Sequence, residues 1–470
     1  MVIKMDLTEC SASEQLAKMT SNRLSARELM QATLARIDAV NPSLNAIVAL
    51  RDADDLMAEA RQLDNGPHRG ALHGLPMAIK DLANVKGIVS SQGSPLLADF
   101  VPETDDLVAA RLRDAGAILI GKTNTPEFGL GSHTFNPVYG VTRNPYDHAR
   151  TCGGSSGGAA VALASGMLAL ADGTDMMGSL RNPAGWNNVY GFRPSVGLVP
   201  AEPKGDTFLH QLSTPGPMAR DPGDLALLLD VMSGIDPRQP HGMDLGTIAP
   251  LRAADPRGAR IGWLGDWGGA FAMEAGILEQ SETALKVFEE LGAIVEPIAP
   301  PFSADAMWDS WTTLRSWQVG AGLAPLLAEG KAQLKDTAIW EIERAQSMSA
   351  LEVHRASVIR SDWFACAADL FSRYDALVLP SAQVWPFELE QEYPTEIAGQ
   401  TMDTYHRWMQ VMIPVSLIGL PCLGVPAGFG AAGLPAGVQI FGRRASDAAL
   451  LALGAAYHAA TKWPQKRPGI

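Results

Sequence analysis

The sequence predicts an α/β protein with a mostly parallel or mixed sheet flanked by helices. Three observations support this prediction. Short apolar strands alternate with helical patterns along the chain. The 470 residues are 47% apolar and 19% charged, a composition typical of a globular protein with a large core. No repeat, low-complexity linker or charge run divides the chain. Length alone favours two or three domains, but this continuity favours one large domain over residues 1–470.

The first predicted elements are two helices that begin with capping boxes, at Ser11 with Glu14 and at Ser25 with Glu28. The second helix is expected to stop near Pro42. The following elements are expected, in order, as a strand at 75–79, a helix at 105–115, a strand at 117–120, a glycine-rich loop at 152–158, a small-residue helix through 164 and a strand at 167–171. Later strands are expected at 261–264, 376–379, 423–425 and 437–441, and residues 303–374 read as helical.

Charge and cysteine content exclude several classes of function. The chain has 37 Lys and Arg against 51 Asp and Glu, a formal net charge of −14. This balance disfavours a nucleic-acid partner and an anionic membrane surface. No apolar run reaches the ~18 residues of a membrane span, and residues 1–10 lack the apolar region of a signal peptide. Four separated cysteines indicate neither disulfides nor a zinc site, so a cytoplasmic protein is expected.

Metal and nucleotide chemistry find little support. The nine histidines contain no H-E-x-x-H and no pair at i, i+4, so no metal site is expected. The loop Gly153–Gly158 precedes a helix but lacks the Lys-Ser/Thr ending of a P-loop. The residues before it, 144–152, are polar and contain Pro145, so no strand is expected there. No cofactor is predicted.

Serine chemistry is the remaining candidate. The glycine-rich loop satisfies G-x-S-x-G with either Ser155 or Ser156 at the centre, but a nucleophile elbow needs a strand directly before it. A simple glycine-serine turn is the alternative. Two other features shift the balance. Lys80 ends an apolar strand and could act as a base if burial lowers its pKa. A later loop, 173–184, carries Ser179 and backbone N–H groups that could form an oxyanion hole.

At these residues the sequence resembles the amidase signature family. The matching stretches are 74–81, 121–128, 150–158 and 173–184, with weaker agreement at 213–220 and 419–442. The resemblance implies a single large domain with a central mixed sheet and a Ser-cisSer-Lys triad. By motif, Lys80 is the base, Ser155 is the bridging serine with a cis peptide bond to Gly154, and Ser179 is the nucleophile. The N–H groups of the 176–179 stretch (Met176, Met177, Gly178) then bind the oxyanion.

Supporting roles follow for three neighbours of the triad. Ser156 either hydrogen-bonds around the triad or caps the following helix. Arg181 either binds a polar substrate group or, as we favour, anchors its loop. Asp175 is expected to organise the loop as an acceptor.

Two residues depart from the family pattern. Met177 stands where most members have glycine, and would cost about 1–2 kcal/mol if that position needs a positive φ. Cys152 replaces a common proline, and is expected to be a small buried residue.

The implied activity is hydrolysis of a linear amide, with residues 1–70 as an N-terminal helical segment, 74–200 as the catalytic core and 300–410 as a variable Trp-rich region. Seven of the eleven Trp side chains fall between residues 308 and 408. Core packing is their favoured role, but if some line the pocket the substrate is a neutral small aryl or alkyl amide. Two alternatives remain open: the A subunit of a tRNA-dependent amidotransferase and a non-catalytic, amidase-like binding protein. A small-molecule amide is the expected partner, and a homo-oligomer remains possible.

Overall fold

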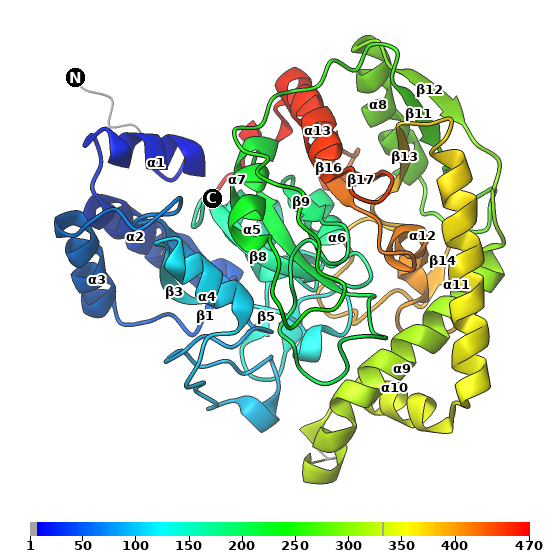
Figure 1. Ribbon diagram of the computed structural model, residues 1–470, viewed down its shortest axis with the longest axis horizontal. Helices are drawn as coiled ribbons and strands as arrows, with labels where there is room; N and C mark the ends of the chain where they lie inside the picture. The colour runs from blue at the N-terminus through cyan, green and yellow to red at the C-terminus, as the bar shows by residue number, and fades with distance from the viewer. Residues whose placement is uncertain (1–6, 331–332) are drawn as a thin grey trace.

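An eight-stranded mixed sheet forms the centre of the structure, a computed structural model that describes residues 7–330 and 333–470 (Figure 1). The strand order is β12-β11-β13-β17-β16-β9-β10-β8. The strands are β8 (Leu170–Asp175), β9 (Tyr190–Arg193), β10 (Thr214–Ala219), β11 (Arg260–Trp263), β12 (Ile294–Pro297), β13 (Ala376–Pro380), β16 (Cys422–Phe429) and β17 (Pro435–Phe441). β11 runs parallel to β12 and β13, and the other neighbours are antiparallel. The predicted α/β domain with a central mixed sheet is confirmed.

A second, three-stranded sheet carries the lysine that the sequence singles out. Its order is β1 (Ile47–Val48), β3 (Ile118–Thr123) and β2 (Pro76–Lys80). The predicted strands at 75–79 and 117–120 therefore exist, but they lie outside the eight-stranded sheet. The two sheets are linked where the Lys80 N–H donates to Asp172 Oδ1 of β8 at 3.0 Å. This contact places the end of β2 beside the edge strand of the central sheet.

The helices surround both sheets. They are α1 (Ala12–Thr20), α2 (Ala26–Leu44), α3 (Ala53–Asn65), α4 (Leu107–Asp114), α5 (Gly157–Ala164), α6 (Arg181–Trp186), α7 (Pro222–Met232), α8 (Ile277–Glu290), α9 (Ala304–Gly330), α10 (Asp336–Ser347), α11 (Ala350–Leu370), α12 (Ile413–Ser416) and α13 (Asp447–Thr461). Figure 1 shows α9–α11 together at one side of the molecule, opposite the N-terminal helices α1–α3. The predicted helical character of 303–374 is confirmed over its described residues, most of which lie in α9, α10 and α11.

The helix starts are predicted better than one helix end. Both capping boxes, at Ser11 and Ser25, are present. The expected stop near Pro42 is early, because α2 continues through Pro42 to Leu44. The C-cap residue is Asn45, which has a left-handed conformation (φ 54°) and donates its N–H to the Asn41 carbonyl. Asn tolerates this conformation better than most residues, so it ends the helix without a glycine.

Around the glycine-rich loop, one predicted strand is displaced along the chain and one predicted absence of a strand is wrong. The strand expected at 167–171 corresponds to β8, which begins only at Leu170 and continues to Asp175. The absence of a strand before the loop is wrong, because β7 (Asp147–Thr151) leads directly into Cys152. It pairs with β6 (Arg143–Asn144) in a hairpin outside the central sheet, with Pro145 in the turn. Most of β7 is half-buried or exposed, so its sequence carries no apolar pattern to reveal it.

Two further hairpins, β4 (Phe135–Asn136) with β5 (Gly140–Val141) and β14 (Glu396–Ile397) with β15 (Gln400–Thr401), complete the strands. Four of the seven tryptophans of the 308–408 region, Trp308, Trp311, Trp363 and Trp408, are buried in one apolar cluster with β13 and α12. Within the described ranges, no helix is both long and apolar enough to cross a membrane.

Candidate active site

Three hydroxyl groups converge on the Lys80 side chain at the end of β2. The Nζ atom lies 2.8 Å from Ser155 Oγ, 2.8 Å from Ser156 Oγ and 3.0 Å from Thr174 Oγ1. Ser155 and Ser156 come from the turn before α5, and Thr174 from β8. Lys80 is almost completely buried. The structure therefore brings Lys80 together with Ser155 and Ser156, which lie 75 and 76 residues further along the chain.

Burial makes Lys80 a candidate base. Removal from water lowers the pKa of Lys80 to about 7, against the opposing effect of the carboxylates of Asp172 and Asp175. Both carboxylates are buried as well. Burial raises the pKa of Asp172, so that carboxylate is itself a weaker source of negative charge. A substantial share of Lys80 is thus uncharged near neutral pH, as proton acceptance requires.

The turn around Ser155 needs small residues for packing. The Gly154–Ser155 peptide bond is cis, as the resemblance implies. A Cβ atom on Gly157 would lie 2.2 Å from Thr134 Oγ1, and one on Gly158 would lie 2.3 Å from the Asn124 nitrogen. Real Cβ atoms do not approach so closely, so glycine at both positions lets α5 begin against β3 and the loop after it.

Ser179 lies in the loop between β8 and α6 and shares a pocket with Ser155. Its carbonyl accepts the Ser156 N–H at 3.2 Å, which ties the two serine-bearing loops together. The pocket has a volume of about 270 Å³ and is lined by both Ser155 and Ser179. Ser179 is 8% exposed, whereas Ser155 is 2% exposed. Of the two serines, Ser179 is therefore the one more open to a bound molecule.

The loop before Ser179 is folded around the Asp175 carboxylate. Its Oδ1 accepts the Gly178 N–H at 2.9 Å and its Oδ2 accepts the Leu180 N–H at 3.1 Å. The Gly178 N–H, one of the expected oxyanion donors, is thus already engaged. The N–H groups of Met176, Met177 and Ser179 make no such contact with the described residues. Of the expected oxyanion donors, only Gly178 is thus engaged within the described part of the chain.

The positive φ in this loop falls on Gly178 (φ 89°) and not on Met177. The departure from glycine at Met177 therefore carries no left-handed strain. Met177 is 3% exposed and packs in the apolar cluster of β13 and α12. Both Met176 and Met177 line the pocket. The two methionines shape the cavity instead of distorting the loop.

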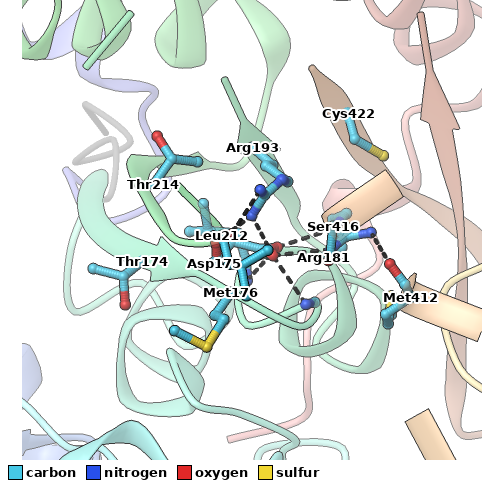
Figure 2. A network of polar contacts seen from close by, with 12 residues as sticks. Thr174, Asp175, Met176, Arg181, Arg193, Leu212, Thr214, Met412, Ser416 and Cys422 are labelled. Atoms are coloured by element: carbon cyan, nitrogen blue, oxygen red, sulfur yellow. Dashed lines mark hydrogen bonds and ion pairs between the residues drawn. The ribbon is translucent and has the colours of Figure 1, made fainter. Parts of the chain in front are cut away.

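Asp175 is also the centre of a buried ion network (Figure 2). Arg181 contacts it at 2.9 Å through both Nε and Nη2, and Arg193 Nη1 lies 3.1 Å from Oδ1. Burial alone would raise the pKa of Asp175, but the two guanidinium groups and the Gly178 N–H hold it well below its usual range. Asp175 is therefore a permanent anion, which fits the expected role as a loop-organising acceptor.

The remaining nitrogen of Arg181, Nη1, is also fully engaged. It contacts Gln439 Oε1 and the Met412 carbonyl, and Nη2 also contacts Ser416 Oγ at 2.6 Å. Arg181 is fully buried and does not line the pocket. These contacts fit the anchoring interpretation and leave no nitrogen for a substrate.

Ser156 and Cys152 differ in what they contribute. Ser156 occupies the N-cap position of α5, but its side chain makes no capping hydrogen bond and lies against Lys80 instead. Burial raises the pKa of Cys152 to about 12, so its thiol stays protonated and behaves as a small apolar group. In the described ranges, no three His, Cys, Asp or Glu side chains are grouped to hold a metal ion.

The pocket wall is mainly apolar but contains no tryptophan among the described residues. Its apolar side chains are Leu82, Phe128, Leu130, Met176, Met177, Val319, Leu323 and Met409. Tryptophan side chains therefore do not mark an aromatic pocket here. The buried tryptophans pack in the core, and methionine, leucine and phenylalanine supply most of the apolar surface of the pocket.

The sequence interpretation missed several polar residues around this site, among them Thr174, Asp172, Arg193 and Arg315. Thr174 lies inside the 173–184 motif but its hydroxyl gives no distinct pattern. Asp172 and Arg193 make their contacts through tertiary pairing, to the Lys80 N–H and to Asp175. Arg315 of α9 lines the pocket more than 130 residues beyond Ser179. Of these residues, only Asp172 could have been identified from the sequence, because it stands at the end of an apolar run.

Comparisons with known proteins identify the family of this chain. A sequence profile of the Amidase family matches residues 28–451. The acylamidase of Rhodococcus erythropolis is 34% identical over 472 residues, which cover 97% of each chain. The A subunit of the glutamyl-tRNA(Gln) amidotransferase of Chloroflexus aurantiacus is 33% identical over 500 residues, which cover 99% of each chain.

Solved structures give the same result. The structure of a bacterial aryl acylamidase of the amidase signature enzymes has a TM-score of 0.90 and 31% identity, covering 98% of this chain and 99% of that one. The structure of the Thermotoga maritima glutamyl-tRNA(Gln) amidotransferase A subunit has a TM-score of 0.76 at 26% identity, covering 99% of this chain and 96% of that one. Because the family profile spans most of the chain and relatives above 30% identity span nearly all of it, this chain belongs to the amidase signature family.

Proposed function

We propose that this chain hydrolyses a carboxylic amide through an acyl-enzyme on Ser179, with Ser155 and Lys80 carrying the proton. The observation that supports this most directly is the 2.8 Å contact between Lys80 Nζ and Ser155 Oγ beside the pocket that Ser179 lines. A lysine whose pKa is lowered to about 7 can accept a proton at neutral pH.

In the acylation step, Ser179 Oγ attacks the amide carbon. Its proton passes to Ser155 Oγ as the Ser155 proton passes to Lys80 Nζ. The oxyanion is stabilised by the unengaged N–H groups of Met177 and Ser179, which act as preorganised donors. The C–N bond then breaks as the relay returns a proton to the leaving amine, and the acyl group stays on Ser179.

Deacylation uses the same groups in the same order. A water molecule attacks the acyl carbon and gives its proton through Ser155 to Lys80. The C–O bond to Ser179 breaks, Ser179 recovers a proton through the relay, and the carboxylic acid leaves. Lys80 begins and ends the cycle uncharged, so no external proton carrier is required.

The substrate class follows from the pocket and from the names of the relatives. Eight apolar side chains line a cavity of about 270 Å³, a size suited to a small molecule. One relative is an acylamidase and one structural neighbour is an aryl acylamidase. We therefore infer a small, neutral aryl or alkyl amide. The helix α9, from the 300–410 region, contributes part of the wall and would tune this preference.

A fluorophosphonate probe tests the nucleophile. We expect modification of Ser179 in the native protein, located by peptide mass spectrometry. Lys80→Ala and Ser155→Ala should slow the labelling by about 10²–10⁴-fold. Ser165→Ala should leave it unchanged, because this buried serine lies outside the site and its hydroxyl, among the described residues, bonds only to α5 carbonyls. Labelling of Ser156 with Ser179 untouched would contradict the triad. No labelling would favour an amidase-like binding protein.

A second candidate function rests on the amidotransferase A subunits among the relatives. That function requires a misacylated tRNA as well as a partner protein. The net charge of −14 disfavours direct tRNA contact by this chain. Affinity purification of the tagged protein from its native host tests the alternative: stable recovery of a B-type subunit would support it, and recovery of the chain without one would support the amidase.

A further inference from the structure

One face of α9 forms a wall of the pocket that contains Ser155 and Ser179. The α9 residues in this wall are Arg315, Gln318, Val319, Gly322 and Leu323. Their spacing of i, i+3, i+4, i+7 and i+8 is that of a single helix face. Two of the five are polar, and they are neighbours at i and i+3. The otherwise apolar wall therefore has a concentrated polar spot on α9.

Two nitrogens of the Arg315 guanidinium have oxygen acceptors, and the third has only a sulfur atom as its partner among the described residues. Its Nε lies 2.9 Å from Glu341 Oε1 and its Nη2 lies 2.7 Å from the Tyr405 hydroxyl. The third nitrogen, Nη1, contacts only the Met176 sulfur, at 3.2 Å, among the described residues. A thioether is a weak acceptor. Arg315 is 4% exposed, so bulk water cannot readily satisfy the hydrogens of Nη1.

The charge of Arg315 is already balanced. Glu341 is completely buried, and its oxygens also accept hydrogen bonds from the hydroxyl groups of Tyr405 and Ser316. A substrate carboxylate at Nη1 would place a second anion on one buried guanidinium, and its desolvation would be poorly compensated. A neutral acceptor avoids this cost. The ion pair thus favours an uncharged oxygen at Nη1.

Gln318 offers the complementary group. Its side-chain oxygen is buried and has no hydrogen-bond partner in the described part of the chain. A buried acceptor without a donor costs free energy until a donor arrives. Gln318 lies one helical turn beyond Arg315 and lines the same pocket. Arg315 and Gln318 therefore bring one donor with only a weak acceptor, and one acceptor without a donor, to neighbouring positions on the same helix face.

We propose that Arg315 and Gln318 form a polar subsite that selects amides carrying a second uncharged group able both to accept and to donate a hydrogen bond. A hydroxyl group or a second carboxamide has this chemistry. Arg315 Nη1 donates to its oxygen, and its O–H or N–H donates to the Gln318 oxygen. This proposal rests on the proposed amide hydrolysis at Ser179 and narrows its substrate class.

The test compares matched substrates. The probes are acetanilide, its hydroxyl-substituted and carboxylate-substituted derivatives, and the corresponding derivatives substituted on the acyl half. We expect at least one hydroxyl derivative to exceed acetanilide in kcat/KM by about tenfold or more, and to exceed its carboxylate counterpart. Gln318→Leu and Arg315→Lys should each reduce this preference by about threefold to tenfold, as expected for a single lost hydrogen bond. Acetanilide itself should change less than the hydroxyl derivative.

Controls separate a subsite from a structural effect. Arg315→Lys keeps a positive charge beside Glu341, and Gln318→Leu carries the test if that variant does not fold. Arg360→Lys, at a half-buried arginine of α11 that reaches the Gln211 carbonyl, should leave the hydroxyl preference unchanged. The same ligands are titrated calorimetrically against Ser179→Ala with and without Gln318→Leu, which measures binding without turnover.

The outcomes are distinct. Equal preference in the native protein and in both variants would overturn the subsite while leaving amide hydrolysis intact. Preference for the carboxylate derivatives would overturn its neutral character. Absence of any hydrolysis, together with hydroxyl-selective binding that Gln318→Leu abolishes, would contradict the proposed function and support the subsite. Absence of selective binding would overturn the subsite in that case too.

Discussion

Lys80 Nζ lies 2.8 Å from Ser155 Oγ, although the two residues belong to separate parts of the fold: one ends β2 of the three-stranded sheet, and the other precedes α5. The contact is buried, and burial lowers the pKa of Lys80 to about 7. The position of the Lys80 amine and its protonation state therefore have one common cause. The same packing that delivers the amine to the serine removes the water that would keep it charged.

Activity should rise with pH through the pKa of Lys80. The active form is the neutral amine, so kcat/KM should increase about tenfold per pH unit below pH 7 and level off above it. Initial rates between about pH 5 and pH 9 with a neutral amide give the profile. A profile that is flat across this range, or that falls as pH rises through 7, would show that Lys80 is not the base.

The lowered pKa of Lys80 also predicts a loss in the free energy of unfolding. The unfolded chain binds a proton at Lys80 up to about pH 10.5 while the native state releases it near 7, so stability rises with pH between these values. Below pH 7 both states are protonated and the full cost of burying the charge applies, at about 1.4 kcal/mol per unit of pKa change. Lys80→Met removes this cost.

Lys80→Met should therefore raise the melting temperature most at about pH 6, and by progressively less toward about pH 9. Differential scanning calorimetry of both proteins across this range measures the difference. Lys86→Met, at a lysine on the loop after β2, is the control and should show no such trend. A gain in Lys80→Met that does not change with pH would mean that the native pKa is close to that of the unfolded chain.

How far the sequence predicts this structure depends on how local each feature is. The capping boxes at Ser11 and Ser25 act within four residues, and both helices begin as expected. The apolar strand before Lys80 is predicted because it is buried on all sides. In contrast, β7 is a polar hairpin strand whose pairing with β6 leaves no apolar pattern.

The site shows the same division. The motif positions Lys80 and Ser155 meet as expected, because long motifs encode the turns that carry them. Two roles were left open for Ser156, and the structure shows the contact with Lys80 and no capping hydrogen bond. The engagement of the Gly178 N–H by Asp175 was not predictable, since it depends on the path of the loop. Arg315 was missed for a different reason: its approach to Met176 is set by how α9 packs, not by any local pattern.

Asp175 should be essential for stability, because it is the carboxylate shared by Arg181 and Arg193 (Figure 2). Asp175→Asn keeps the shape but leaves two buried guanidinium groups without an anion. Breaking a buried ion pair in this way costs about 3–5 kcal/mol. Urea unfolding should show a loss of this size, whereas Asp255→Asn, in an exposed pair with Arg257, should cost far less because water screens that pair. Equal losses in the two variants would contradict the role of Asp175.

Gly178 should be required for both conformation and space. Its φ is 89°, and a Cβ there would lie 2.6 Å from Met412 Cγ. Gly433 has a similar φ of 76°, but a Cβ on it would meet nothing within 4 Å. Gly433→Ala should therefore show only the backbone penalty of about 1–2 kcal/mol and keep its activity.

Gly178→Ala should lose more stability than Gly433→Ala, because the buried Met412 must move as well. The displaced loop would also misplace the N–H groups of Met177 and Ser179, so kcat should fall by about tenfold to a thousandfold. Urea unfolding midpoints of the two variants test the stability prediction. Their kcat values, measured on the same amide, test the prediction for catalysis. If Gly178→Ala lost stability but retained full kcat, the oxyanion donors would have to lie outside this loop, and the assignment to Met177 and Ser179 would fail.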